Sequence, residues 1–212
     1  MISFSGIDCG GKSTQIELIA QEWSRNNKRF KVIHSRVGYT PLLESIKGIV
    51  RKDKKKSEAE QNEYRNAIHS DPNKRRILLK LSILDMGLYY GIVFRLIELF
   101  GYTVLADRYF WDSYIDLKMK YPEFNFEYLV VWKMAKWMYL KPAKSIIYTI
   151  PADLSLYRSS LKEEPWPEDL ETRVKRIQFY QEEIKKNRWQ YVIDATNSID
   201  SVFEDTLRVI NL

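Results

Sequence analysis

Ten residues near the start of the chain carry the pattern with the clearest chemistry. They read Ser5-Gly6-Ile7-Asp8-Cys9-Gly10-Gly11-Lys12-Ser13-Thr14, and residues 6–13 satisfy the pattern GxxxxGK[ST]. Glycines let a backbone fold back until successive N–H groups point inward, where phosphate oxygens can bind. In this pattern the lysine meets the outer phosphates and the hydroxyl binds magnesium. Residues 6–14 are therefore predicted to bind the phosphates of a nucleotide, with Lys12 on the outer phosphates and Ser13 on Mg²⁺.

The segments on either side of this loop support that interpretation. Residues 1–4 can form a short strand, and Ile16, Leu18 and Ile19 recur at roughly helical spacing behind the loop. A helix that starts at the loop directs its positive end toward bound phosphate. The alternative is a glycine-rich turn with a purely structural role.

Four further strands are predicted, at residues 30–35, 103–107, 145–150 and 191–194. Because helical segments separate them, we expect an α/β fold, with a five-stranded parallel sheet between two helical layers. Ligands of such folds gather at the carboxyl ends of the strands. That edge would collect the glycine-rich loop, Arg36, Asp107, Arg108, Asp153 and Asp194.

The longest helical pattern covers residues 77–100, with Gly87 and Gly91 where helices can pack closely. Gly101 is the expected C-cap. Residues 111–140 predict two helices with apolar inner faces, although their interleaved lysines and aromatic residues could also stack nucleic-acid bases.

Other segments predict a helix in residues 42–50, a charged helix at 171–188 and a last helix at 201–210. Asp153 is the expected N-cap of a helix that runs through Arg158. Residues 51–76 are strongly basic and have few apolar side chains. They predict a solvated connection, with phosphate binding or nucleic-acid contact as alternatives.

The composition suits a single domain of 212 residues with a net charge of +6, which favours an anionic ligand. One cysteine excludes an intrachain disulfide and fits a reducing compartment. The apolar run at residues 88–100 is interrupted by Arg95 and Glu98 and is short for a membrane span. We therefore expect a cytoplasmic protein without a membrane partner.

The order of motifs resembles that of thymidylate kinases, which belong to the P-loop nucleoside-monophosphate kinases. Residues 6–14 match the family's GxDGxGKST loop, including Asp8, and Asp107-Arg108-Tyr109 matches its DRY signature. Residues 36–41 resemble its REPGGTP segment, one residue shorter. Residues 193–195 match its closing IDA segment.

The resemblance implies an ATP- and Mg²⁺-dependent kinase that phosphorylates a nucleoside monophosphate such as dTMP, in a P-loop NTPase fold with a helical lid. It implies a lid at about residues 153–170, with Arg158 and Lys162 as catalytic cations. Acceptor binding would involve residues 36–80. The acceptor contacts it implies are Arg36, Lys47, Arg51, Asp107 and Arg108. Enzymes of this kind are usually homodimers.

Within this hypothesis Arg108 grips the acceptor phosphate, because a guanidinium binds phosphate bidentately. Asp8 orients Arg108 or an acceptor hydroxyl, and Asp107 assists Ser13 at the magnesium. The alternatives are an ion pair between Asp107 and Arg108 with only a structural role, an exposed loop charge at Arg36, and a solvated helix face for the two lid cations.

The chain departs from the family where thymine is read. The family's FxxDR pattern supplies an aromatic ring and an arginine, but residues 82–86 read Ser-Ile-Leu-Asp-Met. Losing the hydrogen-bond donor leaves base choice open. A kinase for another nucleotide, a nucleoside or a sugar is therefore the main alternative. A nucleotide-dependent switch lacks a guanine-reading NKxD motif, and a specific nucleic-acid-binding module would leave the glycine-rich loop without a purpose.

Overall fold

A computed structural model describes residues 1–35, 71–162 and 167–211. The sequence-predicted residues Arg36, Lys47 and Arg51, and the predicted helix at residues 42–50, lie outside this part of the chain. Contacts divide the chain into two compact units. The first comprises Met1–Ser35, Leu96–Ile115 and Lys141–Leu212, and the second comprises Arg36–Arg95 and Asp116–Leu140.

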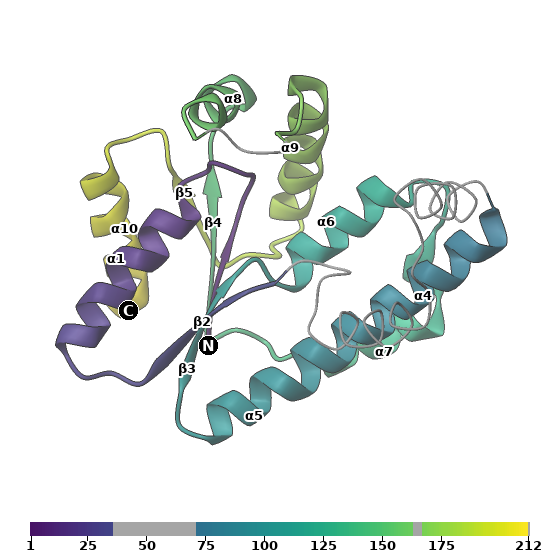
Figure 1. The fold of residues 1–212 in the computed structure, drawn as a ribbon, viewed down its shortest axis with the longest axis horizontal. Helices are drawn as coiled ribbons and strands as arrows, with labels where there is room; N and C mark the ends of the chain where they lie inside the picture. The colour runs from purple at the N-terminus through teal and green to yellow at the C-terminus, as the bar shows by residue number, and fades with distance from the viewer. Residues whose placement is uncertain (36–70, 163–166, 212) are drawn as a thin grey trace, which may run out of the picture. The chain divides into compact units, whose positions relative to one another are not determined.

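The first unit is built on a five-stranded sheet in the order β2-β3-β1-β4-β5, and every neighbouring pair is parallel (Figure 1). The strands are β1 (Ile2–Ser5), β2 (Phe30–His34), β3 (Thr103–Asp107), β4 (Lys144–Thr149) and β5 (Tyr191–Asp194). The α/β class and all five predicted strands are thus confirmed, with ends that agree within one residue.

Burial explains which strands occupy the centre of the sheet. Every residue of β1 is buried, whereas the outer strand β2 has no buried residue and β5 has only Ile193. Central parallel strands are covered on both faces, so they need small or apolar side chains on both sides. Phe4 of β1 stacks on Tyr148 of β4 with nearly parallel rings, 6.4 Å between centroids.

Helices cover both faces of this sheet. The helices of this unit are α1 (Lys12–Arg25), α8 (Ala152–Ser160), α9 (Leu170–Lys185), α10 (Ile199–Asn211) and the first part of α6 (Phe110–Lys120). Helices α1 and α10 lie on one side of the sheet and α9 on the other (Figure 1). The prediction that Asp153 caps α8 is wrong, because Pro151 occupies the N-cap position and Asp153 lies in the first turn. The fixed φ of Pro151 suits the extended conformation of this N-cap residue.

The register of the inner strands determines what lies at their carboxyl ends. Phe4 of β1 and His34 of β2 both pair with Asp107 of β3. The loop that follows β1 therefore leaves the sheet beside Asp107 and Arg108. Adjacent parallel strands bring together segments that are about a hundred residues apart in the sequence.

The second unit is helical in its described residues. One continuous helix consists of α4 (Pro72–Leu88), the π-helical turn η1 (Tyr89–Val93) and α5 (Phe94–Leu99), of which residues up to Arg95 belong to this unit. The remaining elements are the later part of α6, η2 (Phe126–Tyr128) and α7 (Val130–Met138). The two helices predicted within residues 111–140 are confirmed as α6 and α7.

The long helix begins five residues before the predicted start at residue 77, so residues 72–76 do not belong to a solvated connection. The Asp71 carboxylate accepts hydrogen bonds from the backbone amides of Asn73 (2.9 Å) and Lys74 (3.3 Å), and Pro72 follows it. A capping acid followed by proline starts a helix without any apolar periodicity.

The predicted close packing at Gly87 and Gly91 is confirmed. A Cβ at Gly87 would lie 2.9 Å from the Cβ of Ala135, and a Cβ at Gly91 would lie 3.0 Å from the carbonyl oxygen of Met138. These two glycines therefore let α7 approach the long helix until backbones nearly touch.

The helix from Pro72 to Leu99 is long and apolar enough to cross a membrane by length and composition alone. Core helices of soluble proteins meet the same two criteria, and 44% of its most apolar stretch is buried within the structure. The cytoplasmic location remains a prediction.

Candidate functional site

The glycine-rich loop, residues 6–13, joins β1 to α1 and needs unusual backbone conformations to do so. Gly6 has a φ of 134°, and a Cβ there would lie 2.5 Å from the carbonyl oxygen of Tyr148. Gly11, the N-cap of α1, has a φ of 89°. Cys9 adopts a φ of 56° although it is not glycine. The loop therefore turns back on itself before α1 begins at Lys12.

Lys12 lies inside the curve of this loop and is 5% exposed. Its Nζ donates hydrogen bonds to the carbonyl oxygens of Ile7 (2.6 Å) and Gly6 (3.0 Å). Burial, followed by the nearby Arg108 guanidinium, lowers the pKa of Lys12 to about 8, against a smaller opposing effect of nearby carboxylates. Because burial disfavours the charged ammonium, an anion that enters the loop would stabilise it.

Asp107 ends β3 beside the first turn of α1. The Ser13 hydroxyl donates to Asp107 Oδ2 (3.2 Å), which also lies 2.9 Å from His34 Nδ1. The second oxygen, Oδ1, is buried and has no hydrogen-bond partner among the described residues. Buried carboxylate oxygens rarely remain unsatisfied. Asp107 Oδ1 and the neighbouring Ser13 hydroxyl are therefore oxygen ligands that suit a hard cation.

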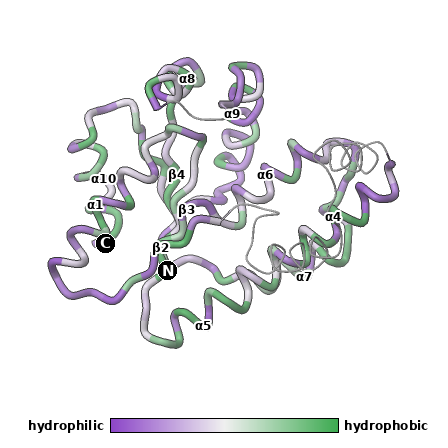
Figure 2. Tube along the Cα trace, viewed as in Figure 1, coloured by the Kyte–Doolittle hydropathy of each residue, from purple (hydrophilic) through white to green (hydrophobic). Residues whose placement is uncertain are grey.

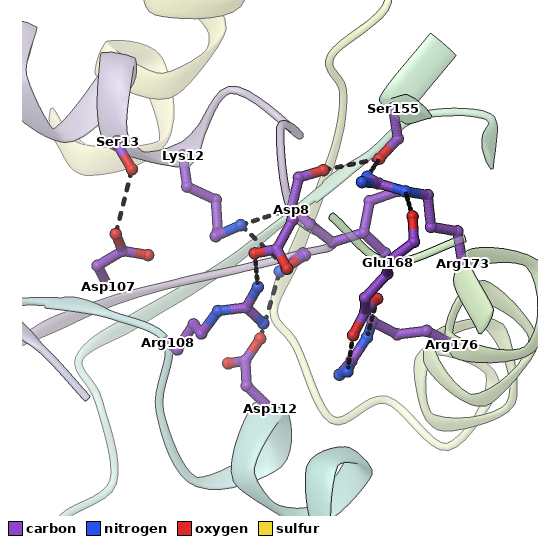
Figure 3. A network of polar contacts seen from close by, with 12 residues as sticks. Asp8, Lys12, Ser13, Asp107, Arg108, Asp112, Ser155, Glu168, Arg173 and Arg176 are labelled. Carbon is purple, nitrogen blue, oxygen red and sulfur yellow. Dashed lines mark hydrogen bonds and ion pairs between the residues drawn. The ribbon is translucent and has the colours of Figure 1, made fainter. Parts of the chain in front are cut away.

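Arg108 follows Asp107 with a φ of 67°, which directs its side chain back over the loop. The guanidinium forms an ion pair with Asp8, and its Nη1 lies 3.5 Å from the Tyr180 hydroxyl (Figure 3). The backbone amide of Arg108 donates to the carbonyl oxygen of Phe4 (2.9 Å). Arg108 therefore pairs with Asp8. The alternative of a structural ion pair between Asp107 and Arg108 is not found among the described residues.

Asp112 in α6 is completely buried and accepts four hydrogen bonds. The donors are the Ser5 hydroxyl (2.6 Å), the Gly6 amide (3.3 Å), the Tyr109 amide (2.9 Å) and the Tyr180 hydroxyl (2.6 Å). One carboxylate therefore connects β1, the glycine-rich loop, α6 and α9. It fixes the start of the loop relative to the residues after β3.

Helices α8 and α9 hold the other side of the loop. The Ser155 hydroxyl donates to the carbonyl oxygen of Asp8 (2.8 Å) and accepts a hydrogen bond from Arg173 (Figure 3). Arg173 also donates to the carbonyl oxygen of Glu168, whose carboxylate forms a bidentate ion pair with Arg176. Arg173 therefore links α8 to α9, and Arg173 and Arg176 together fasten the segment that precedes α9 to that helix.

A cavity of about 120 Å³ lies at the glycine-rich loop. It is lined by Asp8, Cys9, Gly10, Gly11, Lys12, Ser13, Thr14, Asp107, Arg108 and Lys162. One liquid water occupies about 30 Å³, so the cavity exceeds the size of a single ion or water. Three cations and the amino end of α1 open into it, and such an arrangement binds polyanions.

The structure separates the two predicted lid cations. Lys162 lines the cavity, whereas Arg158 Nη2 donates to the carbonyl oxygen of Ala195, just beyond β5 (3.1 Å). Asp194 is exposed at that same strand end and bonds Thr196. The predicted edge residues of the described chain therefore lie at the carboxyl ends of the strands, but only some of them line the cavity.

Sequence reasoning missed Asp112, Tyr180 and Ser155. Asp112 stands in the short stretch after residues 107–109, and this position was its only signal. Tyr180 lies in a helix of mostly charged residues, and its contact with Asp112 spans 68 positions. No local pattern marks such a pair.

A scan against models of protein families finds no match to the chain, and a search of curated protein sequences finds no relative.

Proposed function

We propose that this chain is an ATP-dependent kinase of the P-loop fold that transfers the terminal phosphoryl group of ATP to a phosphorylated acceptor, of which a nucleoside monophosphate such as dTMP is the leading candidate. The observation that carries the proposal is that Lys12, Ser13, Asp107 and Arg108 line one cavity. Two of these residues match a phosphate-binding loop and two match the DRY signature.

The electrostatics of the cavity support a triphosphate as its ligand. Among the described residues, the Lys12 ammonium is hydrogen-bonded by two carbonyl oxygens, which are weaker partners for it than phosphate oxygens. Loop amides and the amino end of α1 would add partial positive charge. Lys162 would supply a further cation beside the transferred group.

The residues present also fit Mg²⁺. Ser13 and Asp107 would hold it, because the unsatisfied buried Asp107 Oδ1 and the Ser13 hydroxyl are oxygen ligands beside the loop. The ion would neutralise charge on the phosphate oxygens during transfer.

The chain's own residues would position the reaction more than take part in bonds. Arg108 would hold the acceptor phosphate so that an oxygen of this phosphate attacks the γ-phosphorus of ATP. The bond from that phosphorus to its bridging oxygen breaks, and ADP leaves with the bonding electron pair. Asp8 would keep the guanidinium aligned, and Asp112 would keep the loop in place through the Gly6 amide.

The base of the acceptor is less well determined than its phosphate. Two side chains of the second unit favour a base other than thymine. Ser82 stands where the thymidylate kinases carry a stacking ring, and it hydrogen-bonds Tyr121, which is 2% exposed. Met86 stands where they carry an arginine and is 1% exposed. A kinase of the same fold for another nucleotide, a nucleoside or a sugar is therefore our second candidate.

An acceptor screen tests the proposal. ADP formation from ATP and Mg²⁺ would be measured with dTMP, dUMP, CMP, thymidine and no acceptor. We expect stimulation by at least one monophosphate and none by thymidine. Arg108→Gln should lower the acceptor-dependent rate by about 10²–10³-fold, whereas Asp205→Asn, in a surface ion pair with Arg208, should not change it.

The outcomes separate the candidates. Equal stimulation by thymidine would favour the second candidate, and the absence of any acceptor effect would refute a kinase for these acceptors. We further propose that the enzyme is cytoplasmic and forms homodimers, as enzymes resembling it do.

A further inference from the structure

Two of the most exposed apolar side chains of the first unit are neighbours at one turn. Leu99 is 80% exposed and Phe100 is 70% exposed, at the end of α5. Gly101, with a φ of 78°, ends the helix there and turns the chain into β3. Both side chains therefore project from a turn at the amino end of the sheet.

A group of cations lies directly beside this turn. The backbone amide of Thr103 donates to the carbonyl oxygen of Arg29 (2.9 Å), so the start of β3 is joined to the segment before β2. A Cβ on Gly101 would lie 3.5 Å from Nη1 of Arg29. In Figure 2 the segment between α1 and β2 is hydrophilic, and the two contacts with Arg29 place this segment beside the end of α5.

The side chains of this segment are arranged around one ring. The Arg29 guanidinium lies 4.5 Å and the Lys31 ammonium 5.1 Å from the centroid of the Tyr102 ring. Lys28 precedes Arg29 in the sequence and is exposed. Its ammonium lies 5.0 Å from the centroid of the Trp23 ring. Within the described chain, none of Lys28, Arg29 and Lys31 forms an ion pair with a carboxylate. We call Lys28, Arg29, Lys31, Leu99, Phe100 and Tyr102 the basic–apolar turn.

We propose that the basic–apolar turn docks this protein on an anionic membrane surface. Exposed apolar side chains can enter the interfacial region of a bilayer, while neighbouring lysines and arginines are attracted to acidic headgroups. Tyrosine suits the same depth, because its ring is apolar and its hydroxyl is polar. Interfacial contact of this kind needs no membrane-spanning segment.

Charge distinguishes this partner from two others. A symmetric dimer would bring the same patch of both copies together, and the three cations, which have no carboxylate partner among the described residues, would repel their counterparts. Nucleic acid would satisfy the cations, but it offers no apolar phase for the Leu99 side chain. An acidic bilayer complements the cations and the apolar pair at once.

The turn is also placed so that docking leaves the candidate site accessible. It lies at the amino ends of β2 and β3, whereas the cavity lies at the carboxyl ends of the same strands. Membrane docking at this turn does not depend on the proposed kinase activity, and vesicle binding can be measured without it.

The test is co-sedimentation of the full chain with vesicles of phosphatidylcholine alone and of equal parts phosphatidylcholine and phosphatidylglycerol. We expect binding to the acidic vesicles only, and weaker binding at high salt. Each Lys or Arg near the surface contributes a factor of about five to binding. Arg29→Gln with Lys31→Gln should therefore weaken it by about 25-fold, and Phe100→Ser by about tenfold or more.

Two controls match these variants. Lys175→Glu on the exposed face of α9 changes the net charge by the same amount as the double substitution, and Val174→Ser removes an exposed apolar side chain elsewhere (41% exposed). Both should bind acidic vesicles as the natural chain does. An equal loss in Lys175→Glu, full binding by Phe100→Ser, or no preference for acidic vesicles would overturn the inference. Dimers in sedimentation velocity that Phe100→Ser dissociates, without vesicle binding, would assign the turn to a second copy.

Discussion

Lys12 should take up a proton when a nucleotide binds, and the size of this uptake follows from its environment. Burial lowers the pKa of Lys12 to about 8 in the ligand-free protein. A bound triphosphate places negative charge against the ammonium and should return the pKa to its usual range, near 10.4. At pH 8 about half of the lysines are neutral before binding, so binding should take up about half a proton per site.

Titration calorimetry at pH 8 measures this uptake directly. A non-hydrolysable ATP analogue would be titrated in two buffers with different ionisation enthalpies, and the difference in observed heat gives the number of protons. Near pH 6 the uptake by Lys12 should approach zero, because the lysine is already charged. Ser13→Ala without Mg²⁺ keeps Lys12 and should keep the uptake at pH 8. Zero uptake at pH 8 with tight binding would refute the placement of the phosphates on Lys12.

The same shift makes folding stability depend on pH. Between about pH 8 and 10.5 the unfolded chain binds more protons at Lys12 than the native chain, so the free energy of unfolding should rise with pH there, by up to about 3 kcal/mol. Burial also raises the pKa of Tyr148, which opposes this rise above about pH 10. Denaturant unfolding between pH 7.5 and about 9.5 should show the increase in the natural chain and not in Lys12→Met, whereas an equal increase in both would contradict the assignment.

Three further substitutions test the scaffold of the site. Asp112→Ala removes the acceptor of four buried hydrogen bonds and should lower the free energy of unfolding by about 3–5 kcal/mol, or the melting temperature by roughly 10 °C; Asp112→Asn should cost less, and a melting temperature close to that of the natural chain for Asp112→Ala would refute the role of Asp112 in joining these elements. Gly6→Ala should abolish ATP binding in calorimetry, because its Cβ would meet the Tyr148 carbonyl at 2.5 Å, and unaltered binding would show that the loop is not the site. Lys162→Gln should lower the maximal rate of ADP formation more than Arg158→Gln does, because only Lys162 lines the cavity; the reverse order would reassign the catalytic cation.

The sheet was predictable because its strands have local signals. Residues 103–107 form an apolar run that ends in an acid, and the loop at residues 6–13 has a fixed spacing, so both were placed correctly from the sequence. The expected parallel order then brought Asp107 and Arg108 beside the loop. Each of these steps uses neighbours in the sequence or the handedness of parallel connections.

The remaining parts depend on contacts that have no local signal. The Asp112 carboxylate collects donors from four elements, and its role follows only from their arrangement in space. Arg158 shares a helix with Ser155, yet its guanidinium is drawn to the Ala195 carbonyl rather than the cavity. The early start of α4 came from a capping acid and a proline, which apolar periodicity does not detect.

The central claim is that the glycine-rich loop holds the triphosphate that is cleaved. The most direct measurement is the initial rate of ADP formation, with Mg²⁺ and the most effective monophosphate, in the natural chain and in Lys12→Ala. We predict acceptor-dependent turnover in the natural chain and a loss of at least about 10²-fold in the variant. Equal turnover by the two proteins would contradict the account.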